Sequence, residues 1–161
     1  MLMHALSALL IALVVLTGAA RAEPEVFSKA GYEADRAAAI EGEKLHVLYF
    51  TASWCPPCQQ MKKTTWVDES VVGWLDEHGL VTAIDVDEEE AMSRQYGIRA
   101  MPTIIALKGE DEIGRTVGYK SPAQMRSWLE AAQAGELLAE KDEQGFDDFD
   151  PENDPVRAKL D

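Results

Sequence analysis

Two cysteines, Cys55 and Cys58, flank a pair of prolines at the junction of two different kinds of sequence. The residues just before the junction, 45–51, form a short apolar run of β-forming residues, which predicts a buried strand. Residues 59–63, just after it, are polar and favour a helix. The motif Cys-Pro-Pro-Cys therefore lies where a strand turns directly into a helix, which indicates a fold with alternating strands and helices.

The rest of the pattern agrees with such an alternation. We expect helices over 28–42, 59–63, 68–77, 87–96 and from Ser121-Pro122 onward, and strands over 45–51, 80–86, 101–107 and 112–117. Ser28 is the expected N-cap of the first helix, and Gly97 follows the acidic fourth one. The order predicts an α/β fold: a three-layer α/β/α domain with a central mixed sheet, parallel in part and ending in an antiparallel hairpin.

Both ends of the chain differ from this middle part. Residues 5–16 are apolar except for Ser7, and Ala20 and Ala22 match the small-residue pattern before a signal-peptidase cleavage site. We therefore expect residues 1–22 to be a signal peptide cleaved near Ala22, with an uncleaved membrane anchor as the alternative. Either way the domain is exported, for example to a periplasm, where disulfides persist.

The C-terminal segment is strongly acidic. Residues 136–161 hold ten acids against three bases, and two prolines interrupt the segment, so we expect an acidic, disordered tail after a globular domain at 23–135. The whole chain has 161 residues and a net charge of −14. This charge argues against nucleic acid as a partner, because the phosphate backbone would repel the protein.

The Cys pair points to redox chemistry. A thiolate is stabilised at a helix N-terminus, so Cys55 is the expected nucleophile, and Cys58, one turn into the helix, is the expected resolving thiol. Pro56 and Pro57 remove two N–H donors, which argues against an extremely acidic Cys55. The alternatives are a structural disulfide or half of a metal site. For a metal the globular part adds only His46 and His78, which we interpret as packing or surface residues, so no metal is expected.

Three segments resemble the thioredoxin superfamily over residues 44–132. They are Phe50–Cys58, Tyr96–Thr103 and Gly118 before the last helix. The resemblance implies a thioredoxin fold in which a cis Pro102 packs beside the Cys pair and the backbone of Met101 pairs with an extended substrate. It also implies that Trp54 shields the thiols and offers an apolar docking face. Pro56, Pro57, Gly97 and Thr103 would support the site.

Two positions depart from thioredoxins. Tyr49 stands where these proteins carry a buried Asp that helps to move a proton from the resolving thiol, and Ala83 stands where they carry a buried Lys. Glu41 and Glu43 are candidates to replace the acid. The continuation over residues 62–66 is similar to exported thioredoxin-like reductases.

The expected function is an exported thiol–disulfide oxidoreductase that reduces disulfides in client proteins. It would need no cofactor beyond the redox-active disulfide Cys55–Cys58, would act as a monomer, and would draw electrons from a membrane donor. Two alternatives remain: a disulfide oxidase or isomerase using the same residues, and a client-binding module whose disulfide is only structural. The reduction potential distinguishes an oxidase or isomerase from the expected reductase. The activity that remains in a folded Cys55→Ala variant distinguishes a binding module from an enzyme.

Overall fold

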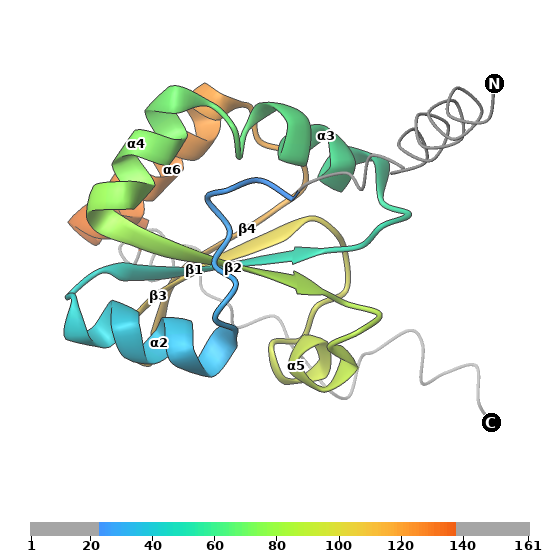
Figure 1. Cartoon of the computed structure of the whole chain (residues 1–161), viewed down its shortest axis with the longest axis horizontal. Coiled ribbons are helices and arrows are strands. Elements are labelled where there is room, and N and C mark those ends of the chain that lie inside the picture. Colours follow the sequence, from blue (N-terminus) through green and yellow to red (C-terminus); the bar gives the residue numbers. More distant parts are fainter. Residues whose placement is uncertain (1–22, 138–161) are drawn as a thin grey trace, which may run out of the picture.

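A four-stranded mixed sheet in the order β2-β1-β3-β4 forms the centre of the molecule (Figure 1). The computed structural model describes residues 23–137, so the predicted signal peptide and residues 138–161 of the predicted tail lie outside the described residues. The strands are β1 (Leu45–Thr51), β2 (Gly79–Asp85), β3 (Thr103–Lys108) and β4 (Asp111–Val117). β1 pairs parallel with β2 and antiparallel with β3, which confirms the predicted mixed sheet.

Helices cover both faces of this sheet, as the alternating pattern predicts (Figure 1). One face carries α3 (Pro56–Thr64), α4 (Glu69–His78) and α6 (Pro122–Ala134), and the other carries α2 (Tyr32–Glu41) and α5 (Glu90–Gln95). Ser121 caps α6 through a capping box with Gln124, in agreement with the Ser-Pro start seen in the sequence. Among residues 23–137, none of the helices has the length and apolar character needed to cross a bilayer.

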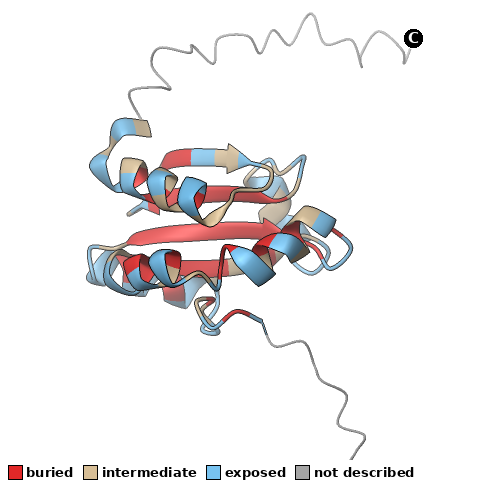
Figure 2. Ribbon diagram, turned by 90° about the horizontal axis from the view of Figure 1, so that it is seen from above, coloured by how far each residue is buried: buried red, intermediate tan, exposed pale blue. Residues whose placement is uncertain are grey.

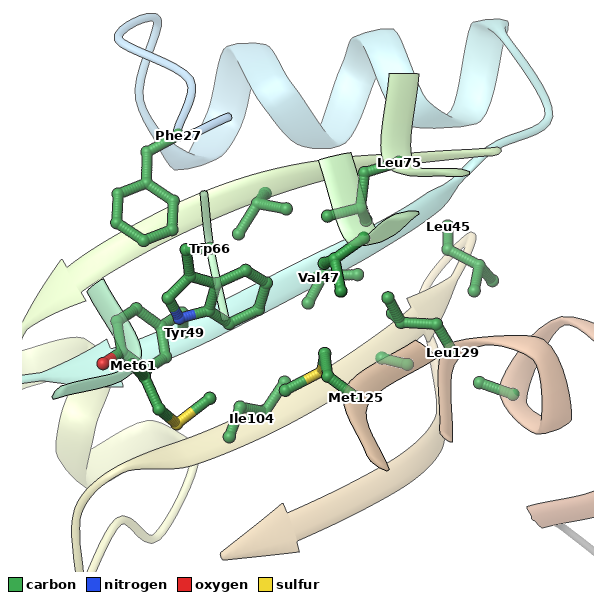
Figure 3. Packing of buried hydrophobic residues seen from close by; sticks show 14 of the residues in the cluster. Phe27, Leu45, Val47, Tyr49, Met61, Trp66, Leu75, Ile104, Met125 and Leu129 are labelled. Carbon is green, nitrogen blue, oxygen red and sulfur yellow. The ribbon is translucent and has the colours of Figure 1, made fainter. Parts of the chain in front are cut away.

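The core lies on both sides of β1, whose seven residues are all buried (Figure 2). Successive side chains of a strand point to opposite faces, so Val47 and Tyr49 join one apolar cluster while Leu48 and Phe50 join the other. The first cluster is the larger, and Trp66 packs within it against Tyr49 and Phe27 (Figure 3). Trp74 is buried there too, whereas Trp128 is only partly buried against its edge.

The first helix begins later than the sequence indicates. Phe27 forms an isolated parallel bridge with Val81 of β2, and the Ser28 N–H donates to the Val81 carbonyl at 2.9 Å. Residues 27 and 28 are therefore extended along the sheet edge, and α2 starts at Tyr32 after Gly31, whose φ of 89° suits glycine. Ser28 is not the N-cap, and its hydroxyl donates to Asp35 instead. The acidic helix is also shorter than expected, because the residues before it form a turn. In this turn the backbone N–H of Asp87 donates to the Asp85 carboxylate, and the backbone N–H of Glu89 donates to the Asp85 carbonyl.

A buried polar network connects α2 to the sheet. The Thr82 hydroxyl donates to Asp35 Oδ2 at 2.6 Å, and His46 Nε2 lies 2.7 Å from Thr82 Oγ1. Because the single Thr82 proton serves the carboxylate, His46 Nε2 is the donor in the second bond. His46 is 1% exposed, and its Nδ1 finds no partner in the described part of the chain. Burial lowers the pKa of His46, although nearby Asp35 opposes that effect.

We expect this histidine to make the fold less stable in mild acid. Because the pKa of His46 is lower in the folded chain, the unfolded chain binds a proton that the folded chain does not. The free energy of unfolding should therefore fall as the pH drops from about 6.5, the usual histidine pKa, through the lower folded value. Urea unfolding between pH 7.5 and 5 measures this slope, and His46→Gln should flatten it. His78→Gln, at a more exposed histidine, is the matched control. An unchanged slope in His46→Gln would refute the prediction.

Candidate active site

The Cys pair occupies the first turn of α3, directly beyond the end of β1. Cys55 is the N-cap residue of the helix, with extended backbone angles, and Pro56 and Pro57 form its first turn. This is the arrangement in which proline is favoured, because the first helical N–H groups have no partner within the helix. Cys55 and Cys58 are joined by a disulfide.

One backbone donor serves the Cys55 sulfur. The Cys58 N–H donates to Cys55 Sγ at 3.3 Å, whereas the two intervening prolines have no N–H to offer. Both cysteines are buried, Cys55 at 4% exposed and Cys58 at 0%. Cys55 lies nearer the surface at the helix end, and Cys58 faces the large core cluster. This placement is compatible with the predicted roles of nucleophile and resolving thiol.

Trp54 lies on the surface beside the disulfide. It is 62% exposed, far more than the other three tryptophans of the domain. Its indole N–H donates to Asp87 Oδ2 at 2.7 Å. The turn after β2 that carries Asp87 therefore holds the ring in place. Asp87 was not among the residues predicted from the sequence, because its contact with Trp54 joins segments 33 residues apart.

The Met101–Pro102 loop reaches the same end of the sheet through strand pairing. Thr103, the first residue of β3, pairs with Phe50 near the end of β1, so the residues before it lie next to the Cys turn. The peptide bond between Met101 and Pro102 is cis, as the resemblance implies. The Pro102 carbonyl accepts from Gly118 N–H at 2.8 Å, and the Thr103 hydroxyl donates to the Ala100 carbonyl at 2.7 Å.

Two further predicted residues take clear structural places. Met101 is half-buried and packs against the cluster that contains both cysteines, so its side chain is partly available to a partner. Gly97 follows α5 with a φ of 61°, a left-handed backbone conformation that favours glycine. Gly97 shapes the loop that leads to the cis-proline and lies outside the Cys turn.

Tyr49 replaces a charged group with a neutral one beneath the Cys pair. Its hydroxyl donates to the Cys58 carbonyl at 2.9 Å, and burial is the main cause that raises its pKa to about 12. Tyr49 pairs across the sheet with Ala83, so the two positions that depart from thioredoxins lie side by side. Tyr49 is therefore a neutral hydrogen-bond donor at physiological pH and provides no carboxylate.

The acids expected to replace the missing carboxylate lie elsewhere. Glu41 and Glu43 are exposed and come just before β1, whereas the Cys pair follows the other end of that strand. A strand of seven residues is roughly 20 Å long, so neither carboxylate reaches the cysteines. On the side of α3, Glu23 forms an ion pair with Lys62. No sequence pattern connects these two residues, which are 39 positions apart.

The arrangement suits thiol–disulfide exchange. A disulfide lies at a helix N-terminus, with an exposed aromatic ring on one side and an irregular loop on the other. Across residues 23–137, no cluster of three or more His, Cys, Asp or Glu side chains is arranged to hold a metal ion. A disulfide at the start of a helix can exchange two electrons with another pair of thiols.

Known proteins share this domain. A family model described as a thioredoxin-like domain matches residues 32–133. The thioredoxin of Echinococcus granulosus is 35% identical over 94 residues, which cover 58% of this chain and 83% of that protein. Thioredoxin H4 of Arabidopsis thaliana is 32% identical over 80 residues, and the match spans 65% of that relative's length.

Solved structures have the same architecture. A thioredoxin from Thermus thermophilus superposes with a TM-score of 0.60 at 26% identity, over 69% of this chain and 91% of that one. A DsbH oxidoreductase superposes with a TM-score of 0.61 at 16% identity, over 67% and 85% of the two chains, and this likeness concerns the fold alone. From the family match, the strand order and the Cys-Pro-Pro-Cys turn beside a cis-proline, we conclude that this chain belongs to the thioredoxin-like family.

Proposed function

We propose that this chain is an exported thiol–disulfide oxidoreductase that reduces disulfides in client proteins. The observation that carries the proposal is the Cys55–Cys58 disulfide at the N-terminus of α3, beside the cis-proline loop. That position puts Cys55 at the surface end of the helix, nearer to an incoming disulfide than Cys58, and keeps Cys58 within reach of it. A purely structural disulfide would not require the exposed Trp54 at its side.

The proposed cycle transfers two electrons. In the reduced chain the Cys55 thiolate attacks one sulfur of a client disulfide, and the other client sulfur leaves as a thiolate that takes up a proton. Cys58 then loses its proton and attacks Cys55 Sγ in the mixed disulfide. The client leaves with its second thiol, and Cys55–Cys58 is again a disulfide.

The two prolines favour the reducing direction. A strongly oxidising pair arises when the reduced form is stabilised, chiefly through the thiolate. Here Pro56 and Pro57 withhold two N–H groups from Cys55 Sγ, and within residues 23–137 only the Cys58 N–H donates to it. The Cys55 thiolate consequently receives less stabilisation than a helix N-terminus can provide, and the disulfide is correspondingly less oxidising.

Client binding and resupply of electrons complete the proposal. An extended client segment would pair with the Met101 backbone and contact the Trp54 ring, which is exposed and held by Asp87. If the leader directs export, the oxidised pair needs an electron donor in the membrane, because cytoplasmic reductants do not reach it. The protein would act as a monomer and need no cofactor beyond the Cys pair.

The reduction potential of Cys55–Cys58 tests the direction. Equilibration with dithiothreitol or glutathione buffers, followed by tryptophan fluorescence, should give a value close to that of thioredoxin, about −270 mV. The exposed Trp54 next to the disulfide is the expected reporter, and Trp54→Phe should remove most of the signal while leaving the potential near its original value. A potential near about −120 mV would contradict the reducing role and indicate a donor of disulfides.

The assignment of the two cysteines predicts a trapping variant. Cys58→Ala should accumulate mixed disulfides with clients through Cys55, because the second step of the cycle has lost its nucleophile. Non-reducing electrophoresis of material from the native compartment would reveal the adducts, and Cys55→Ala is the matched control that should form none. Unchanged biological activity of Cys55→Ala would instead support a binding module with a structural disulfide.

A further inference from the structure

The segment before α2 forms a strap across the edge of the sheet next to the redox helix. We define this N-terminal strap as residues 23–28; in Figure 1 it runs in blue from beside α3 past β2 to α2. Phe27 anchors it through the bridge to Val81 and through ring contacts with Tyr49 and Trp66, whose centroids lie 5.6 and 5.5 Å away (Figure 3). Pro24 is buried as well. The start of the strap is therefore fixed against the cluster beneath the cysteines.

Glu23 and Lys62 join this strap to α3. Lys62 Nζ lies 3.0 Å from Glu23 Oε1 and 2.9 Å from Oε2, so the ammonium contacts both carboxylate oxygens. The Lys62 side chain is only 15% exposed, whereas the Glu23 side chain is 57% exposed. The cation is therefore the more buried partner, and its charge acts through a medium that screens it less than water does.

The pair lies on the Cys58 side of the helix. Lys62 follows Cys58 by four residues, a spacing that puts two side chains on the same face of a helix. Tyr49 gives a second, independent indication, because its hydroxyl donates to the Cys58 carbonyl and its ring packs against Phe27 of the strap. Burial is the main cause that raises the pKa of Tyr49, and the negative charge of Glu23 adds to it. Glu23, Lys62, Tyr49 and Cys58 are thus neighbours in one small region.

We propose that Glu23 and Lys62 are positioning residues that set how readily the Cys pair ionises. The Lys62 ammonium favours a thiolate in the first turn of α3, and the Glu23 carboxylate offsets that effect. The pair takes the place of the buried charges that Tyr49 and Ala83 lack, and it reaches the site from the strap instead of from the sheet. This inference rests on the proposed redox cycle but not on its direction.

The two members of the pair have opposite effects, and this distinguishes an electrostatic role from a structural one. Removing the Glu23 charge leaves Lys62 uncompensated, which favours the thiolate. Removing the Lys62 charge leaves Glu23 uncompensated, which disfavours it. A pair that only fastened the strap would respond alike to both changes, because either one breaks the same contact. The other titratable groups to consider are Tyr49, Glu25, Lys63, Tyr119 and Asp87, which contacts Trp54 beside Cys55. In a chain cleaved near Ala22 the α-amino group of Glu23 joins them. None of these groups differs between the two variants.

The experiment compares Glu23→Gln and Lys62→Met in the full chain after reduction. The ultraviolet absorbance of the thiolate, followed against pH, gives the titration of the Cys pair. We expect the titration to move to lower pH in Glu23→Gln and to higher pH in Lys62→Met, each by about three- to tenfold in the thiolate-to-thiol ratio at fixed pH. Glu25→Gln and Lys63→Met are the matched controls, since both residues are exposed and lie within two positions of Glu23 and Lys62, and they should move the titration much less.

Glutathione equilibrium provides the second readout. Above the titration midpoint, the reduced fraction at a given buffer ratio should rise in Glu23→Gln and fall in Lys62→Met, because thiolate stabilisation favours the reduced form. Shifts of both variants in the same direction, or of neither, would overturn the inference. A wild-type chain whose disulfide could not be reduced and reoxidised would instead refute the proposed function. The two failures are therefore distinguishable.

Discussion

The burial of β1 along its whole length is the constraint on which the site depends. This strand lies between β2 and β3, and its alternating side chains supply both apolar clusters of the domain. Its C-terminal end therefore has a fixed position, and the turn that carries Trp54 and Cys55 begins there. Pairing of Phe50 with Thr103 then brings the cis-proline loop to the same end. The Cys pair and the cis-proline loop, which are far apart in the chain, lie together because β1 leads into the first and pairs with the strand that follows the second.

Aromatic packing and a peripheral ion pair occupy the region where thioredoxins have the buried Asp and Lys that this chain lacks. Tyr49, Trp66 and Phe27 pack together under α3. The Tyr49 hydroxyl donates a hydrogen bond to the Cys58 carbonyl, where thioredoxins have a carboxylate that helps to move a proton. Burying a carboxylate among these rings would require a paired cation or a large pKa shift. Glu23 and Lys62 lie closer to solvent, where an ion pair is easier to accommodate. The domain thus keeps charge near the cysteines without placing it inside the sheet.

Prediction from the sequence succeeded where the signal was local. The apolar run that forms β1, the Ser-Pro start of α6 and the strand-to-helix turn at the cysteines depend on residues close together in the chain. It failed at Ser28, because the neighbouring Phe27 pairs with β2 and keeps that segment extended. It also failed for Glu41 and Glu43, which were nominated for their charge alone and lie at the other end of β1. Asp87 and Glu23 were missed, since nothing near them in sequence indicates their partners.

The sequence by itself determined the layered architecture and the position of the Cys pair, and its resemblance to the thioredoxin superfamily indicated the family. The architecture and the position of the pair follow from short-range patterns: alternating hydrophobicity, helix caps, and two cysteines spaced by two prolines. Only the tertiary structure decided which side chains surround that pair, namely Asp87 holding Trp54, Tyr49 beneath Cys58, and Glu23 next to Lys62. The physical reason is that these contacts join residues far apart in the chain. Their proximity depends on how the strands pair and how the strap packs against β2, and no local pattern encodes either.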